Sequence, residues 1–262
     1  RRVFADEDSP VFMGAVGDLV AAMMMDEPKI SAAFKSGQGV GWNERAECLF
    51  CGTARFFRAA YKHHLTQEWL PALDGVVGKL QRGAKVADVG CGHGISTTLM
   101  AKAFPNSRFY GFDAHPGSID DARARAQSEQ LGNQVAFSVE SAKTFPTNNY
   151  DLVCFFDCLH DMGDPVGALK HVRETMDADG TCLLVEPFAN DRLEDNLTPV
   201  GRVYYAASTM VCTPASLAQE VGLALGAQAG EARLRNVAAS AGFSRFRRAT
   251  ETPFNLVLEA RP

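Results

Sequence analysis

The sequence predicts an α/β protein built on a mainly parallel, doubly wound sheet. Between residues 83 and 188, short apolar runs alternate with amphipathic segments, as in parallel strands joined by helices. The first run, Lys85–Gly90, breaks into three alternating glycines, and the second run ends on an acid, Asp113. Near the end of the chain two further runs flank a short turn at Glu251–Pro253, and strands joined so closely must be antiparallel.

The first half of this region contains two strand–helix units and a third strand. The first helix ends before Pro105, because proline disfavours helical backbone in the residue that precedes it. The second helix stops at Gly132, a residue that commonly follows a helix. The expected elements are, in order, Lys85–Gly90, Ile95–Phe104, Ser107–Asp113, Pro116–Leu131 and Val135–Glu140.

The second half continues the alternation and adds the antiparallel hairpin. The strand Tyr150–Phe156 is nearly all apolar, as expected for a strand covered on both faces. Asp164 provides a helix cap with Pro165 at the first helical position. The stripe of that helix is Ala168, Leu169, Val172 and Met176, and the later elements are Thr181–Glu186, Gly230–Gly242, Phe243–Ala249 and Phe254–Ala260.

Two regions lie outside the alternating core. Residues 1–82 have apolar residues at helical spacing, with a break at Gly37–Trp42 and a last helix from about Glu68. Residues 188–229 follow the fifth strand and contain an expected helix capped by Thr213–Pro214. We expect residues 1–82 to form a helical lid and residues 83–262 to form the main domain. Within that domain, residues 188–229 are expected to form a second lid over the substrate.

Composition excludes several classes of protein. The chain has 262 residues, 46% of them apolar and 22% charged, which is ordinary for a soluble globular protein. A net charge of −5 argues against a nucleic-acid groove, because phosphate binding needs clustered Lys and Arg. The one basic cluster, Arg245, Arg247 and Arg248, is expected to lie on a solvated or edge strand. No apolar run reaches the roughly 20 residues that span a bilayer, so no membrane partner is expected.

Seven cysteines and no secretory signal indicate reduced thiols and a cytoplasmic location. Cys48 and Cys51 have the spacing of metal ligands, but no second such pair accompanies them, and no metal site is expected. The chain begins at Arg1 without an initiator Met, so we expect it to be a fragment of a longer protein.

The glycine run Val86-Ala-Asp-Val-Gly-Cys-Gly-His-Gly94 carries the strongest functional signal. Its spacing is G-x-G-x-G, with Asp88 two residues before the first glycine, and not the G-x-G-x-x-G of dinucleotide sites. A glycine turn lets the backbone approach a nucleotide-like ligand, and an acid after the second strand can hold ribose hydroxyls. The alternative is a tight turn with no ligand.

Together with Asp113, this run resembles the first motif of the class I S-adenosylmethionine (SAM) methyltransferases. That resemblance implies a Rossmann-like seven-stranded sheet of order 3-2-1-4-5-7-6 with the last strand antiparallel. It also implies SAM as cofactor and S-adenosylhomocysteine as product. Here Asp113 holds the ribose, Asp88 orients the ammonium of the amino-acid tail, and the adenine lies between the ends of strands two and three. The implied cofactor-binding residues are Asp88, Gly90, Cys91, Gly92, Gly94, Asp113, Ala114, His115, Ser141, Ala142, Phe156 and Asp157.

Some of these residues have simpler readings. Asp113 could cap the next helix, and Ser141 could only turn the chain. In the N-terminal region, Arg58 and Tyr61 could fold over the cofactor tail, with Arg58 pairing its carboxylate. A solvated Arg and a core Tyr are the alternatives.

The segment Leu159-His-Asp161 is similar to the catalytic loop of SAM-dependent small-molecule O-methyltransferases. That similarity implies His160 as general base, a role for which imidazole is suited by its pKa near neutrality. Asp161 would orient the ring, and Glu186 would position either His160 or the substrate. The alternatives are a His160 that packs over the cofactor or caps a helix, and a Glu186 bonded to loop amides.

Residues from about Gly37 to the end resemble bacterial SAM-dependent methyltransferases that carry an N-terminal winged-helix-like domain. That domain is expected to be missing here, and any homodimer is expected to form mainly through it. We expect methyl transfer to a small, largely apolar acceptor, with oxygen favoured. Carbon or nitrogen methylation and a SAM-binding regulator remain open, and an NAD(P)-dependent oxidoreductase is disfavoured by the glycine spacing. The stretches that carry the resemblance are Phe56–Arg58, Glu68–Pro71, the glycine run, Cys158–Asp161 and Thr213–Pro214.

Overall fold

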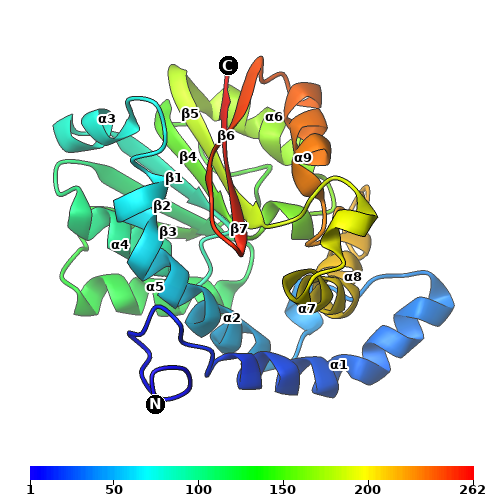
Figure 1. Cartoon of the computed structure of the whole chain (residues 1–262). Helices are drawn as coiled ribbons and strands as arrows, with labels where there is room; N and C mark the ends of the chain where they lie inside the picture. Colours follow the sequence, from blue (N-terminus) through cyan, green and yellow to red (C-terminus); the bar gives the residue numbers. More distant parts are fainter.

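A seven-stranded sheet runs through the middle of the computed structural model, which describes residues 1–262 (Figure 1). The strand order is β3-β2-β1-β4-β5-β7-β6; β1 to β5 pair in parallel, and β7 is antiparallel to both of its neighbours. The expected order and its antiparallel strand are therefore confirmed. The strands are β1 Lys85–Val89, β2 Arg108–Asp113, β3 Val135–Val139, β4 Tyr150–Phe156, β5 Met176–Pro187, β6 Arg245–Glu251 and β7 Asn255–Arg261.

Helices cover both faces of the sheet and form two apolar cores. Helices α3 (Val76–Arg82), α4 (Ile95–Ala103) and α5 (Pro116–Ser128) pack on one face. Helices α6 (Pro165–Thr175) and α9 (Gly230–Ser240) pack on the other. Because β1, β4 and β5 lie between the two layers, their residues are almost all buried.

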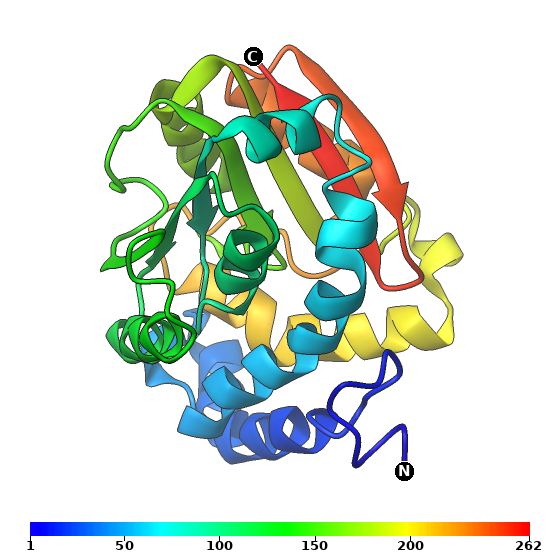
Figure 2. The ribbon, with the colours of Figure 1, turned by 90° about the vertical axis from the view of Figure 1, so that its left-hand side faces the viewer.

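Most of the remaining helices gather beyond one end of the sheet, as the two ribbon views agree (Figures 1 and 2), whereas residues 61–69 pack beside α4 on the first face. They come from the N-terminal region and from the segment after β5. The N-terminal set is α1 Val16–Ser36, the short η1 Trp42–Glu44, α2 Glu47–Ala60 and the π-helix η2 Tyr61–Trp69. The later set is η4 Leu193–Asn196, α7 Pro199–Ala207, the π-helix η5 Ser208–Cys212 and α8 Thr213–Leu217.

Three predicted boundaries are wrong for local reasons. The helix expected from Glu68 is interrupted, because the chain turns before α3 at Gly75, whose φ is +72°. Helix α5 ends at Ser128, before the expected Gly132 stop, and Gln130 takes the left-handed conformation there. Met176 belongs to β5 and not to the helix before it.

The helix expected to start at the Thr213–Pro214 cap starts earlier. Thr198 accepts a hydrogen bond from the Gly201 amide, and Pro199 occupies the first helical position. Helical backbone then continues through η5 into α8. The cap residue Thr198 lies fifteen residues before Thr213, the predicted cap, by the difference between their residue numbers (213 − 198).

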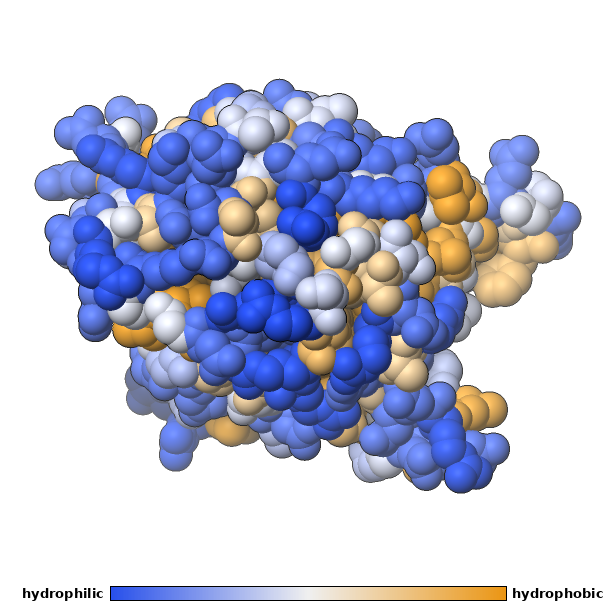
Figure 3. Space-filling model, turned by 90° about the horizontal axis from the view of Figure 1, so that it is seen from above, coloured by the Kyte–Doolittle hydropathy of each residue, from blue (hydrophilic) through white to orange (hydrophobic).

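The arginine cluster lies on the edge strand β6, as expected. Arg247 pairs with Asp74 at 3.0 Å, and Arg248 pairs with Glu231 at 2.7 Å. Charges on an exposed edge oppose pairing with another chain. Seen from the end opposite the gathered helices, the surface is mainly hydrophilic (Figure 3). None of the helices is both long and apolar enough to cross a membrane.

Trp69 ties the N-terminal helices to the sheet. It is fully buried at the end of η2, and its ring lies 6.4 Å from that of Phe156 at the end of β4 and 6.2 Å from that of Tyr61. Large buried aromatic rings contribute strongly to packing.

We expect Trp69→Ala to lower the free energy of unfolding by about 3–5 kcal/mol, because truncation leaves a cavity under η2. Urea denaturation followed by circular dichroism measures this change. The control is Phe34→Ala, at a side chain 71% exposed, which should change stability by less than about 0.5 kcal/mol. Equal stabilities of the two variants would contradict this role for Trp69.

Candidate functional site

The chemistry-bearing residues converge where the ends of β1 and β4 meet. The chain leaves β1 toward β2 on one side, whereas β4 pairs with β1 on the other side. Such a switch point leaves a crevice outside the carboxyl ends of the strands, where ligands bind in open α/β sheets. The glycine turn follows β1, and the segment that we call the β4 loop (residues 157–164) follows β4.

All three glycines of the turn need their conformational freedom. Gly90, Gly92 and Gly94 have φ values of +74°, +50° and +70°. A Cβ on Gly90 would lie 2.6 Å from the sulfur of Cys158, so the turn and the β4 loop are in close contact. A Cβ on Gly92 would meet nothing within 4 Å. The backbone at Gly92 therefore faces open space that a ligand could occupy.

Asp113 connects the glycine turn to the chain after β2. Its carboxylate accepts hydrogen bonds from the amides of Gly92 at 2.9 Å and His115 at 2.8 Å. Burial raises the pKa of Asp113, and those two amides oppose the shift. The alternative in which Asp113 caps α5 is wrong, because His115 is the N-cap and accepts from the Ser118 amide.

Asp88 is a buried carboxylate with one free oxygen. Its Oδ2 accepts from the hydroxyls of Ser96 and Thr97, each at 2.6 Å. Its Oδ1 is buried without a hydrogen-bond partner. Burial raises the pKa of Asp88 to about 6, against the two hydroxyl donors, which lower it. A half-satisfied buried carboxylate beside a glycine turn is a suitable partner for a ligand cation.

Asp157, the first residue of the β4 loop, has the same character. Its φ is +52°, an unusual conformation for a residue other than glycine. Its Oδ1 accepts from Asn255 at 2.8 Å, whereas its Oδ2 is buried and unpaired. Burial, reinforced by Glu186, raises its pKa. Sequence reasoning missed Asn255, because β7 brings it here from the far end of the chain.

Tyr61 and Phe156 form an aromatic wall on this side of the sheet. Their ring centroids are 5.5 Å apart, and both side chains are buried. The pKa of Tyr61 is raised well above its usual value by burial, with the charges of Asp157 and Asp88 adding to the effect. The structure thus places Tyr61 near the two half-satisfied carboxylates.

The structure does not bring Arg58 to this place. Its guanidinium donates to the Asp8 carboxylate at 2.8 Å and to the Glu7 carbonyl at 3.0 Å. This pairing with the N-terminal segment agrees with the alternative of an Arg on the solvent side. The contact of Arg58 with a cofactor tail stays a prediction, and it would require the guanidinium to leave these two partners.

The expected adenine side lies at the ends of β2 and β3. Ala114 is exposed and Ala142 is half-buried. Ser141 turns the chain through hydrogen bonds with Thr144. His115 stacks on Phe50 of α2, with ring centroids 4.1 Å apart. Phe50 is therefore a residue of the expected adenine side that sequence reasoning missed.

His160 and Glu186 form a buried pair between the β4 loop and the end of β5. His160 Nδ1 lies 2.6 Å from Glu186 Oε2, and Glu186 Oε1 accepts from the Leu159 amide at 3.1 Å. The other ring nitrogen, Nε2, lies 3.3 Å from Asp161 Oδ1. Burial by itself lowers the pKa of His160, but the carboxylates of Asp161 and Glu186 outweigh burial and hold that pKa well above its usual value. Glu186 therefore fixes the orientation of the ring.

Cys212 joins this group from the π-helix η5. The ligand atoms of His160, Asp161 and Cys212 all lie within 4.8 Å of one another. Burial and the nearby Asp161 raise the pKa of the Cys212 thiol to about 11. Sequence reasoning missed this residue, because only the irregular helix after β5 carries its sulfur to the β4 loop. Both π-helices of the chain, η2 and η5, thus contribute to the site, as π-helical turns often do.

The segment after β5 also holds the β4 loop in place. Gln219 accepts a hydrogen bond from the Gly163 amide at 3.0 Å and donates to the Asp161 carbonyl at 2.9 Å. Ser216 donates to the Met162 carbonyl at 2.8 Å. The glycine segment before Trp42 packs against α8, because a Cβ on Gly39 would clash with the backbone of Pro214 and Ala218.

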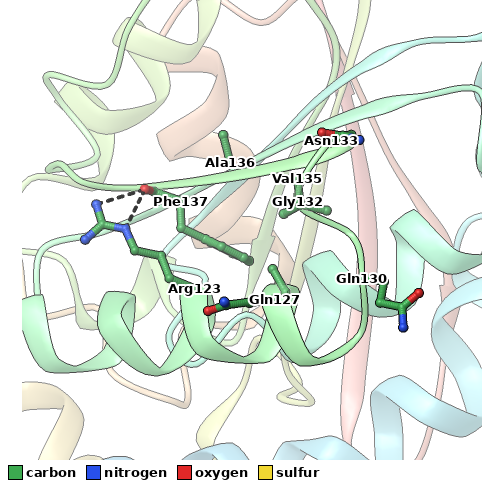
Figure 4. A pocket seen from close by; sticks show the side chains of 9 residues that line it. Arg123, Gln127, Gln130, Gly132, Asn133, Val135, Ala136 and Phe137 are labelled. Atoms are coloured by element: carbon green, nitrogen blue, oxygen red, sulfur yellow. Dashed lines mark hydrogen bonds between the residues drawn. The ribbon is translucent and has the colours of Figure 1, made fainter.

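A separate surface hollow of about 490 Å³ lies between α5 and the edge strand β3 (Figure 4). Arg123 crosses it and donates two hydrogen bonds to the carbonyl of Phe137. Its lining includes neither the glycine turn nor any residue of the β4 loop. This hollow is distinct from the site at the strand ends.

Comparisons with known proteins agree with this geometry. A model of the methyltransferase domain matches residues 80–242, more than half of the chain. The trans-aconitate 2-methyltransferase of Streptomyces avermitilis is 37% identical over 71 residues, which cover 27% of this chain and 26% of that protein. The ubiquinone biosynthesis O-methyltransferase of Acinetobacter baylyi is 27% identical over 146 residues, covering 55% and 56%. The matches thus span about a quarter and about half of these relatives.

Solved structures share the fold across nearly the whole chain. PigF bound to S-adenosylhomocysteine superposes with a TM-score of 0.72 at 16% identity, covering 100% of this chain and 77% of PigF. An O-methyltransferase family protein of Burkholderia thailandensis gives 0.68 at 18% identity, covering 98% and 74%. Human N-acetylserotonin methyltransferase bound to SAM gives 0.64 at 18% identity, covering 98% and 72%. With the matching family model, the glycine turn and the strand order, these observations show that the chain belongs to the methyltransferase domain family and has the class I methyltransferase fold.

Proposed function

We propose that the protein is a SAM-dependent methyltransferase that methylates a small, largely apolar acceptor at an oxygen atom. The observation that carries the proposal is that two groups lie side by side at the carboxyl ends of the central strands. One is the glycine turn with its two half-satisfied carboxylates, and the other is the buried His160–Glu186 pair. Methyl transfer is an in-line displacement, for which an enzyme mainly supplies proximity and orientation.

SAM fits the first group by its charges and shape. Its ribose hydroxyls would bind Asp113, and its ammonium would find the unpaired oxygens of Asp88 and Asp157. The open space beside Gly92 admits close approach of the ligand to the backbone. Ala114, His115, Ser141 and Ala142 would border the adenine. SAM supplies the methyl group as a sulfonium electrophile when bound.

His160 would take the proton of the acceptor oxygen. Glu186 holds Nδ1, so the remaining nitrogen, Nε2, is the end of the ring that accepts a proton. The positive sulfonium of SAM opposes the protonated form of a neighbouring imidazole, which counters the carboxylates that raise its pKa. Asp161 and Glu186 act as positioning residues, because both carboxylates lie against the ring.

The acceptor class rests on the lid and on related proteins. Aromatic and aliphatic residues of α2, η2 and η5 surround the strand ends, which suits an apolar molecule. Among the proteins of this fold, NcsB1 has been solved with S-adenosylhomocysteine and 1,4-dihydroxy-2-naphthoic acid, which is a hydroxylated aromatic acid. Mitomycin 7-O-methyltransferase also shares the fold. Carbon or nitrogen methylation is the alternative, in which His160 would not act as a base.

The first prediction from the proposed function tests the cofactor site. Asp113→Asn should weaken SAM binding by about 1.5–3 kcal/mol, the usual contribution of hydrogen bonds to a charged group. Isothermal titration calorimetry with SAM measures the change. Asp120→Asn, at an exposed acid on α5, is the matched control and should bind SAM like the wild type. Unchanged affinity in a folded Asp113→Asn variant would show that SAM does not bind at this acid.

The second prediction concerns pH. Asp88 loses its charge as the pH falls below about 6, and a neutral acid no longer attracts the SAM ammonium. SAM affinity should therefore decrease on acidification from pH 7.5 to roughly 5, a range chosen to span that pKa. Asp88→Asn should bind SAM weakly at the higher pH and show a flatter pH dependence. Because the pKa of Asp113 is raised as well, the comparison between the variant and the wild type isolates the part due to Asp88.

The third prediction tests the base. In protein treated with a metal chelator, His160→Ala should lower the rate of methyl transfer by about 10²–10⁴-fold. SAM affinity should stay nearly unchanged, because the imidazole acts on the acceptor. A screen of phenols, acids and amines supplies the acceptor, and His64→Ala, at a half-buried ring of η2, is the control. Full turnover by His160→Ala would favour carbon or nitrogen methylation, or an acceptor that is already ionised.

A further inference from the structure

Cys212 has no role in the proposed methyl transfer, and it forms a largely buried group with His160 and Asp161. This group combines an imidazole nitrogen, a carboxylate oxygen and a thiol sulfur, three of the atoms that hold transition metals in proteins. All three ligand atoms lie within 4.8 Å of one another. The sequence directed attention only to Cys48 and Cys51, and neither belongs to this group.

The distances suit a common ion. Zinc bonds to nitrogen and oxygen of about 2.0–2.2 Å place two tetrahedral ligands about 3.4 Å apart. His160 Nε2 and Asp161 Oδ1 are 3.3 Å apart, close to that ligand–ligand distance, and they do not form a hydrogen bond with each other. This oxygen is buried and has no hydrogen-bond partner. An unpaired carboxylate oxygen beside a ring nitrogen is what an ion would satisfy.

Glu186 orients the His160 ring so that Nε2 faces Asp161 and Cys212. Glu186 accepts from His160 Nδ1, so the lone pair of the neutral ring is directed from Nε2. Carboxylate–histidine–metal arrangements of this kind fix the tautomer of a metal-binding His. Arg45, the nearby guanidinium, donates through its two terminal nitrogens to the carbonyls of Met210 and Val211, and not to Asp161.

We propose that His160, Asp161 and Cys212 form a binding site for a divalent transition-metal ion, and that their mixed donors suit Zn²⁺. Three protein ligands leave a coordination position for water or for an oxygen of a bound molecule. On binding, the ion takes up the Nε2 lone pair and the Cys212 thiol releases its proton. One nitrogen cannot hold an ion and accept a proton at once, so the ion-bound protein lacks the base of the metal-free protein. The site shares His160 with the proposed methyl transfer, but ion binding is measured without any methyl transfer.

Cobalt titration tests the site directly. Co²⁺ is added to the full chain after chelator treatment, and binding to a thiolate is followed by its charge-transfer absorption in the near ultraviolet. We expect one Co²⁺ per chain with this absorption, and its loss when Zn²⁺ displaces the cobalt. Glu186→Gln should keep the absorption and weaken cobalt binding by about 10–100-fold. Loss of the carboxylate that bonds the other ring nitrogen of a metal-binding His has an effect of this size.

Two cysteine variants decide which thiol binds. Cys212→Ser should lose the charge-transfer absorption, whereas a Cys48→Ser, Cys51→Ser double variant should keep it. Circular dichroism and SAM titration establish that each variant is folded. An absorption that survives Cys212→Ser, or no cobalt binding by the folded wild-type chain, overturns the proposal. Neither result reads methyl transfer, so a failure here is distinct from a failure of the proposed enzyme activity.

Discussion

The close contact between the glycine turn and the β4 loop is the constraint on which the rest of the site depends. Gly90 has no room for a side chain, because its Cβ would lie only 2.6 Å from the sulfur of Cys158. The sulfur of Cys158 also lies 3.2 Å from the carbonyl of Val89. Since β1 and β4 are direct neighbours, this contact sets the proposed cofactor site beside the proposed base. A larger residue at Gly90 would separate the two and strain the backbone at φ +74°.

Buried carboxylates make the carboxyl ends of the central strands negatively charged. Asp88, Asp157 and Glu186 are almost completely enclosed, and burial raises the pKa values of the first two. Buried charges are costly unless a partner satisfies them, and two of these acids keep an oxygen with no partner. A cationic ligand would satisfy those oxygens. The nearby carboxylates also favour the protonated form of His160, and a positively charged cofactor beside it would oppose that form.

The helices beyond the sheet complete the site and connect its parts. Trp69 and Tyr61 pack η2 onto the end of β4, and Phe50 stacks on His115 after β2. From the other side, Gln219 holds the β4 loop through two backbone groups. The N-terminal helices and the segment after β5 also pack against each other, through Arg45 and a shared apolar cluster. Local packing of these segments, and not only the strand ends, determines how closely a ligand is surrounded.

The sequence by itself determined the strands, their order through a family resemblance, and most residues at the strand ends. Glycine spacing, terminal acids and the Leu-His-Asp segment are local signals, because strand and turn chemistry depend on neighbouring residues. Only the tertiary structure decided the partners. Glu186 meets His160 across two strands, Asn255 meets Asp157 across β5, and an irregular helix carries Cys212 to the β4 loop. Long-range packing and side-chain direction settle such contacts, and neither has a period or spacing that a single sequence displays.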